Sequence, residues 1–246
     1  MQYEIKGTTM PAVEIHLTEG ESVFTEIGEM SWMSNTIDMS TGTRGGLGGI
    51  FNRVIAGESL LMTTFTCKGP QGVVAFTPHL PGQIIPVTLA EGQSVIAEQR
   101  AFMVAEDGIK LEVHFKRRLG SGLFGGEGFI LQKLTGPGTA FIEVGGEIVE
   151  YNLAKGQSLR VNPGHIAMYE PTVDYDIHMV RGIRNLLFGE EGLFLAALNG
   201  PGKVWLQTMP FSNYMGLILD NIPKPDPQAL EKLIDQRVEA AMKKQK

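Results

Sequence analysis

The strongest constraint on the fold is an internal threefold repeat. A short turn, Gly-Glu/Gln-Ser, occurs three times, at residues 20–22, 92–94 and 156–158. A Gly-Pro turn also occurs three times, at residues 69–70, 136–137 and 200–201. The period of roughly 64 to 72 residues is longer than that of solenoid repeats and suits one small β module. The sequence therefore predicts three concatenated modules, at about residues 1–80, 81–146 and 147–211.

Each module has the pattern of β-strands. In residues 12–17, Val13, Ile15 and Leu17 alternate with polar residues, which gives a strand one buried and one exposed face. The 31 glycines and 13 prolines separate such short apolar runs, as expected for turns between strands. We therefore predict an all-β fold of three β-sandwich-like modules, with Trp32 anchoring the core of the first.

The second half of each module combines an acidic turn, an apolar strand, the Gly-Pro turn and another apolar strand. Residues 120–146 show this order most clearly. Because glycine accepts positive φ and proline suits a turn, we interpret each block as a β-hairpin. Met33, Met103 and Met168 recur in the first halves, and we interpret them as core residues.

The acidic turns supply the one candidate metal site. If a pseudo-threefold axis relates the modules, Glu58, Glu127 and Glu191 lie on one ring. Three carboxylates that converge on an axis could hold Ca²⁺ or Mg²⁺, which prefer oxygen ligands. The alternative is that these are solvated turn residues that pair with nearby arginines and lysines. Both interpretations stay open at this point.

The C-terminal segment differs from the repeats. We predict one β domain over residues 1–222, followed at 223–246 by a proline-rich linker and an amphipathic helix. Asp226 suits the N-cap and Pro227 the first helical position. Apolar residues recur at helical spacing from Leu230 to Met242. Such an apolar face must pack against its own β domain or against a neighbouring subunit.

No pattern in the sequence indicates catalysis. The glycine-rich stretch at residues 42–49 lacks the Gly-Lys-Ser/Thr of a phosphate-binding loop, and the five histidines lack metal-ligand spacing. Cys67, the one cysteine, lies in an apolar strand and is expected to pack there. We therefore expect a protein that is not an enzyme and needs no cofactor.

The charge balance bears on partners and location. With 27 acidic against 21 basic residues, the net charge of −6 disfavours binding to phosphate backbones. We expect no DNA partner and consider RNA binding unfavourable. No window approaches the roughly 18 apolar residues of a spanning helix, and the start of the sequence is not a signal peptide. The expectation is a cytoplasmic protein, with peripheral membrane contact through the tail helix left open.

Three segments carry a family resemblance: AKGQSLRVNPGHIAMYE, FGGEGFILQKLTGPG and FGEEGLFLAALNGPG. With them the chain resembles bacterial members of the altered inheritance of mitochondria protein 24 family, over about residues 1–220. The resemblance implies a fold similar to the tryptophan RNA-binding attenuation protein, a short open variant of the double-stranded β-helix. It implies little about activity, since the bacterial members have none established and the mitochondrial relatives are associated with organelle organisation.

Three hypotheses about function follow. The first is a non-enzymatic scaffold or protein-interaction protein that self-associates and binds protein partners. The second is a module that binds a small molecule or a divalent metal in a cleft between modules. The third, RNA binding, rests on analogy with the attenuation protein alone.

Overall fold

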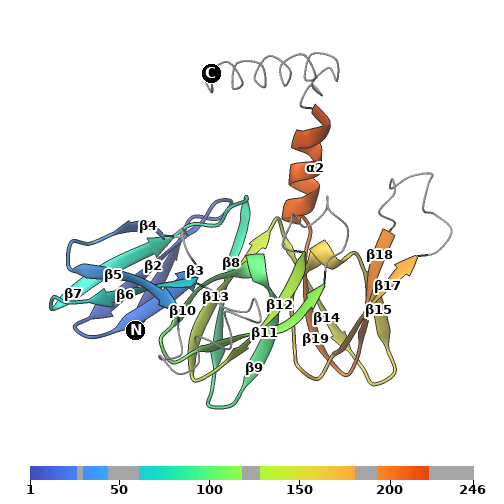
Figure 1. Cartoon of the computed structure of the whole chain (residues 1–246), viewed down its shortest axis with the longest axis horizontal. Coiled ribbons are helices and arrows are strands. Elements are labelled where there is room, and N and C mark those ends of the chain that lie inside the picture. Colours follow the sequence, from blue (N-terminus) through green and yellow to red (C-terminus); the bar gives the residue numbers. More distant parts are fainter. Residues whose placement is uncertain (27–29, 44–60, 118–127, 181–192, 222–246) are drawn as a thin grey trace, which may run out of the picture. The chain divides into compact units, whose positions relative to one another are not determined.

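We describe a computed structural model of the chain, which covers residues 1–26, 30–43, 61–117, 128–180 and 193–221 (Figure 1). The chain divides into two compact units, Met1–Ser212 and Asn213–Lys246. The first unit holds antiparallel β-sheets, and the one α-helix among the described residues is α2 (Phe211–Asn221). An all-β fold with a C-terminal helix is therefore confirmed. Residues 222–246, where the sequence predicted a helix, lie outside the described residues.

The strands follow one another in the same order in each repeat. The first repeat holds β1 (Gln2–Lys6), β2 (Ala12–Thr18), β3 (Ser22–Glu26), β4 (Met30–Met33), β5 (Ile37–Thr43), β6 (Leu61–Cys67) and β7 (Gln71–Phe76). The second holds β8 (Gly82–Leu89), β9 (Ser94–Glu98), the 3-10 turn η1 (Gln99–Ala101), β10 (Phe102–Glu106), β11 (Lys110–Arg117), β12 (Phe129–Thr135) and β13 (Gly138–Gly145). The third holds β14 (Ile148–Leu153), β15 (Ser158–Val161), η2 (Pro163–His165), β16 (Ile166–Tyr169), β17 (Asp174–Val180), β18 (Leu193–Asn199) and β19 (Gly202–Gln207).

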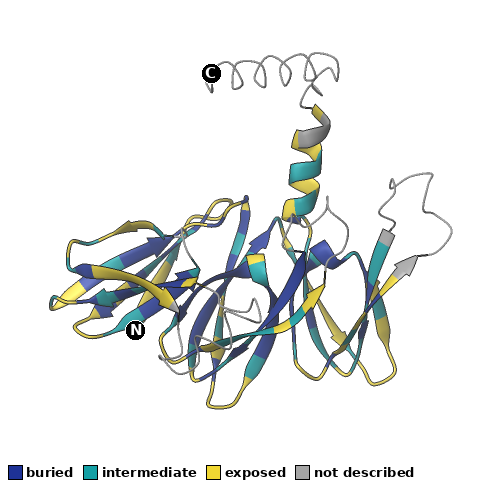
Figure 2. Ribbon diagram, in the orientation of Figure 1, coloured by how far each residue is buried: buried dark blue, intermediate teal, exposed yellow. Residues whose placement is uncertain are grey.

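Each module contributes three strands to each of two sheets, and the first module adds β1 beside β2. In the second module these are β8, β13 and β10 on one side, and β9, β12 and β11 on the other. Three clusters of buried apolar residues form the cores, one centred on each module, and each includes residues of a neighbouring module. Figure 2 shows that the buried residues are concentrated in the strands, whereas the turns are mostly exposed.

Neighbouring modules are joined by strand pairing. β3 pairs with β10, which merges a sheet of the first module with a sheet of the second in the order β5-β6-β3-β10-β13-β8. β9 pairs with β16 in the same manner, giving β11-β12-β9-β16-β19-β14. The sheets β1-β2-β7-β4 and β15-β18-β17 end in β4 and β15 respectively.

The two repeated turns pack against each other, which explains their sequence. Gly92 has a φ of 74°, and the side chain of Gln93 accepts a hydrogen bond from the amide of Ala90 at 2.8 Å. In the other two turns, the side chain of Glu21 accepts a hydrogen bond from the amide of Thr18, and the side chain of Gln157 accepts one from the amide of Ala154. The amide of Gly136, in the Gly-Pro turn, donates to the carbonyl of Gln93 at 2.9 Å.

The Gly-Pro blocks are not hairpins, so that interpretation was wrong. β12 pairs with β9 and β11, whereas β13 pairs with β8 and β10, so the two strands flanking Gly136 belong to different sheets. The turn is a corner that carries the chain from one layer to the other. A side chain at Gly136 would place its Cβ 2.5 Å from the carbonyl oxygens of Leu89 and Ala90, so glycine is required there.

Most of the expected core residues are buried, but two on β4 are not. Cys67, Met103 and Met168 are at most 2% exposed. Trp32 is 46% exposed and Met33 is 37% exposed, so the expectations that Trp32 anchors the first core and that Met33 is a core residue were wrong. The reason is that β4 is the last strand of its sheet, so that these side chains lack the neighbouring strand that covers their counterparts in the other modules.

Candidate functional site

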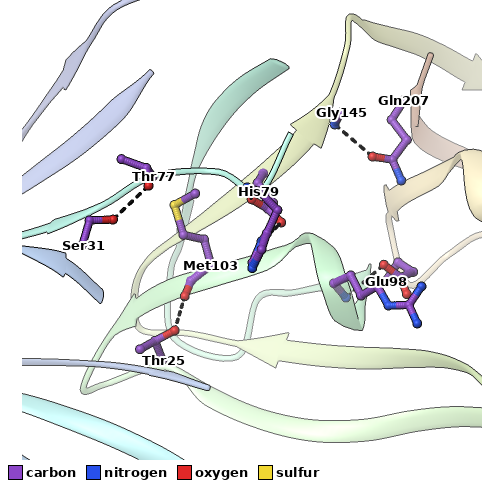
Figure 3. A network of polar contacts seen from close by, with 10 residues as sticks. Thr25, Ser31, Thr77, His79, Glu98, Met103, Gly145 and Gln207 are labelled. Atoms are coloured by element: carbon purple, nitrogen blue, oxygen red, sulfur yellow. Dashed lines mark hydrogen bonds and ion pairs between the residues drawn. The ribbon is translucent and has the colours of Figure 1, made fainter. Parts of the chain in front are cut away.

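A cavity of about 280 Å³ lies within the first compact unit, where segments of all three modules meet. Glu26 and His79 come from the first module, Glu98, Arg100 and Glu143 from the second, and Gly164, Gln207 and Phe211 from the third or the segment after it. We call it the inter-module cavity. Figure 3 draws some of its polar contacts, those at His79, Glu98, Gly145 and Gln207.

Two of its carboxylates occupy equivalent positions in the repeat. Glu26 is the last residue of β3 and Glu98 is the last residue of β9, each four residues after the serine that ends the Gly-Glu/Gln-Ser turn. In the third module Asn162 takes this position, directly after β15. The cavity is therefore built from the repeat but is not symmetric in charge.

Glu98 is the most deeply buried charged group in the cavity, with 7% of its surface exposed. Its Oε2 accepts a hydrogen bond from the backbone amide of Arg100 at 2.9 Å and caps η1, as the Asn162 side chain caps η2. Burial raises the pKa of Glu98 from its ordinary 4.5 to about 7. The charge and backbone amide of Arg100 oppose this rise, while Glu143 and Glu26 add to it.

Glu26 is held by two glutamine side chains of the second module. Gln132 Nε2 donates to Glu26 Oε1 at 2.8 Å, and Gln99 Nε2 lies 3.1 Å from Glu26 Oε2. Gln132 is fully buried, and its Oε1 has no hydrogen-bond partner in the described part of the chain. Ser212 Oγ, which lines the cavity, is likewise buried without a partner there. Such atoms are rare in folded proteins and indicate unused hydrogen-bonding capacity.

A second repeated position ties the modules together at the cavity wall. Glu143 lies on β13, and its Oε2 accepts a hydrogen bond from the backbone amide of His79 at 2.9 Å. Its Oε1 lies 2.8 Å from His79 Nδ1. Gln207, the corresponding residue on β19, accepts from the amide of Gly145 at 3.0 Å and donates to the carbonyl of Gly164 at 2.9 Å. Each of these side chains therefore binds the backbone of the preceding module.

The charges of the cavity suit a cation. Glu26, Glu98 and Glu143 are acidic, whereas Arg100 is the one arginine or lysine among the residues that line the cavity. The Arg100 guanidinium already lies over the ring of Phe211, 5.2 Å from its centroid. The proximity of Glu26 and Glu143 disfavours the charged form of Glu98. A bound cation would relieve this repulsion.

The predicted metal ring of Glu58, Glu127 and Glu191 lies outside the described residues, so it stays a prediction. Within the described residues, the ligand atoms of Glu4, Glu14 and His16 lie close enough to hold an ion. Lys6 Nζ is already 2.5 Å from Glu14 and 3.5 Å from Glu4, and this ion pairing accounts for the cluster.

Sequence reasoning missed Glu26, Glu98 and Glu143 as site residues. The signal for Glu98 was present, because Glu26 and Glu98 stand at the same place in two repeats. Glu143 carried no such signal, since its counterparts are Thr77 and Gln207.

Three comparisons place the chain among known proteins. The profile of the family described as mitochondrial biogenesis AIM24 matches residues 3–209. An uncharacterised protein of Streptococcus pyogenes serotype M6 is 27% identical over 226 residues, which cover 89% of either chain. A crystal structure of a Streptococcus pyogenes protein superposes with a TM-score of 0.71 at 23% identity, covering 90% of this chain and 99% of that one, and so shares the fold. No helix among the described residues is long and apolar enough to cross a membrane.

Proposed function

We propose that this chain, which belongs to the mitochondrial biogenesis AIM24 family, is a binding protein without catalytic activity whose inter-module cavity holds a small organic cation with a primary ammonium group. The observation that carries the proposal is the Glu98 carboxyl, which is 7% exposed and lines a cavity that also contains Glu26 and Glu143. Family membership supports the fold and does not itself supply the ligand.

Ligand chemistry follows from charge and hydrogen bonding. An ammonium group has three donors and no acceptor, which matches carboxylate oxygens and the Oγ of Ser212, an atom with no hydrogen-bond partner among the described residues. Phe102 and Phe211 add apolar surface for a short alkyl chain. A volume of about 280 Å³ is at the lower end for small-molecule sites, so the ligand is small. The carboxylates are held by backbone amides, Glu98 by Arg100 and Glu143 by His79, which suits them to position a ligand.

Calorimetric titration with n-butylamine tests the proposal, with butyrate as the probe of opposite charge. We expect butylamine to bind and butyrate not to bind. Binding should be roughly tenfold tighter at pH 8 than at pH 6, because Glu98 with a pKa of about 7 is mostly ionised only at the higher pH. Glu98→Gln keeps an acceptor for the Arg100 amide but removes the charge, and should abolish binding. Glu112→Gln is the matched control, because the Glu112 side chain is 42% exposed and lies outside the cavity. If butylamine does not bind at millimolar concentration, or binds Glu98→Gln equally well, the proposal is wrong.

A second candidate function is that of a non-enzymatic scaffold that self-associates and binds protein partners. The exposed Trp32 and Met33 on β4 favour it, because large apolar side chains on an edge strand mark an interaction surface. We also propose a cytoplasmic location. We propose further that the chain has no nucleic-acid partner, because a net charge of −6 disfavours contact with phosphate backbones. Retention of RNA on filters at low salt would contradict the last point.

A further inference from the structure

We propose that β15 of one copy of this chain pairs antiparallel with β4 of a second copy, so that copies join end to end through the junction that already joins the modules. This inference rests on the scaffold function proposed above and names its partner. It does not depend on a ligand in the inter-module cavity.

The two junctions inside the chain are equivalent. Where the first and second modules meet, Phe24 of β3 lies opposite Ala105 of β10. Where the second and third modules meet, Ile96 of β9 lies opposite Tyr169 of β16. Counted from the Gly-Glu/Gln-Ser turns, Phe24 corresponds to Ile96 and Ala105 corresponds to Tyr169. Equivalent strands therefore pair at both junctions, and they pair in the same register.

The same equivalence identifies two strands, β4 and β15, whose counterparts form the junctions but which have no partner from another module in the described residues. β4 pairs with β7 through Met33 and Val74, as β10 pairs with β13 through Ala105 and Ala140, so β4 is the first-module counterpart of β10 and β16. By its place after the turn and its pairing with β18, β15 is the third-module counterpart of β3 and β9. In the sheets of the described residues, β4 and β15 are terminal strands.

Burial supports the same conclusion. Val104 and Ala105 are fully buried at the first junction, and Met168 and Tyr169 are 1% exposed at the second. Their counterparts on β4 are Trp32 and Met33, which are 46% and 37% exposed. The positions that a partner strand covers twice inside the chain are uncovered on β4. A short apolar edge without a lysine or proline is a template for strand addition.

A second copy is the partner that fits, because it carries the complementary edge in the required register. Transferring the register places Arg160 of one copy opposite Met33 of the next, and Val161 opposite Trp32. β4 has no charged side chain, so Arg160 meets no like charge there. Because the two edges differ, each added copy presents a fresh β4 or β15, as in any head-to-tail assembly.

Pairwise cross-linking tests the register. Met33→Cys protein is mixed with Arg160→Cys protein, both carrying Cys67→Ser, and oxidised. Residues directly opposite in an antiparallel pair are close enough for a disulfide, whereas residues two positions away are too far apart. We expect a covalent dimer from this mixture and severalfold less from Met33→Cys with Ser158→Cys. Equal yields from the two mixtures would overturn the register.

Sedimentation of the full chain tests the association itself. We expect the wild type to have a mass that is a multiple of 26.8 kDa, and Trp32→Lys/Met33→Lys to sediment as a monomer with an unchanged circular dichroism spectrum. Met10→Lys, at a site 63% exposed on another surface, should leave the mass unchanged. A monomeric wild type at 100 µM, or a disulfide formed only within one Met33→Cys/Arg160→Cys chain, would overturn the proposal. Amine binding by the monomeric variant would show that the cavity function stands separately.

Discussion

The buried carboxyl of Glu98 makes the stability of this protein depend on pH in a direction opposite to that of most acidic residues. Its pKa is raised from 4.5 to about 7 in the folded chain. Between these two values the folded state keeps the proton and the unfolded state releases it. The free energy of unfolding therefore falls as the pH rises through this window.

The magnitude follows from the shift. A change of about 2.5 pKa units corresponds to about 3 kcal/mol, of which about 2.5 kcal/mol is lost between pH 5 and pH 8. Glu98→Gln cannot titrate at this position, and its amide oxygen can still accept the hydrogen bond from Arg100. Relative to wild type, the variant should gain about 2.5 kcal/mol on going from pH 5 to pH 8.

Urea unfolding followed by circular dichroism at pH 5, 6, 7 and 8 measures this difference. All other titrating groups are common to the two proteins, so subtracting the two curves isolates Glu98. Glu112→Gln removes the same charge from a half-exposed position outside the cavity and is the matched control. If the Glu98→Gln difference is flat across the pH range, Glu98 is not held in a desolvated site, and its role as the charged group of the cavity is refuted.

Three further substitutions test other parts of the structure by the urea midpoint. Tyr169→Phe should raise stability by about 1 kcal/mol, because the Tyr169 hydroxyl is buried with no hydrogen-bond partner in the described part of the chain; a loss would show that it has one. Gly82→Ala should cost about 3 kcal/mol, since its Cβ would lie 1.9 Å from the carbonyl oxygen of Val144 in the β8–β13 pair, whereas Gly42→Ala, with open space around it, should change little. Gln93→Ala should cost about 1 kcal/mol by removing the acceptor for the Ala90 amide, and an unchanged midpoint would mean that water replaces it.

Local patterns predicted the strands well. Val13, Ile15 and Leu17 alternate in the sequence and are all buried, because one face of β2 packs on the core. The repeated turns were also readable, since positive φ at Gly92 and a side-chain acceptor at Gln93 are local requirements. Pairing between strands was not readable, because β12 and β13 are adjacent in sequence and apolar whether they pair with each other or lie in separate sheets.

The sequence by itself determined that the chain is β-structured and where its turns lie, and it predicted a threefold repeat, because alternation, glycine, proline and the Gly-Glu/Gln-Ser turn act over a few residues. Only the tertiary structure decided which residues of other modules surround each repeat position. Glu98 becomes a buried acid because three modules converge on it, and Trp32 is exposed because β4 ends a sheet. In both cases the same repeat position has a different environment in another module, and that environment depends on pairing between residues far apart in the chain.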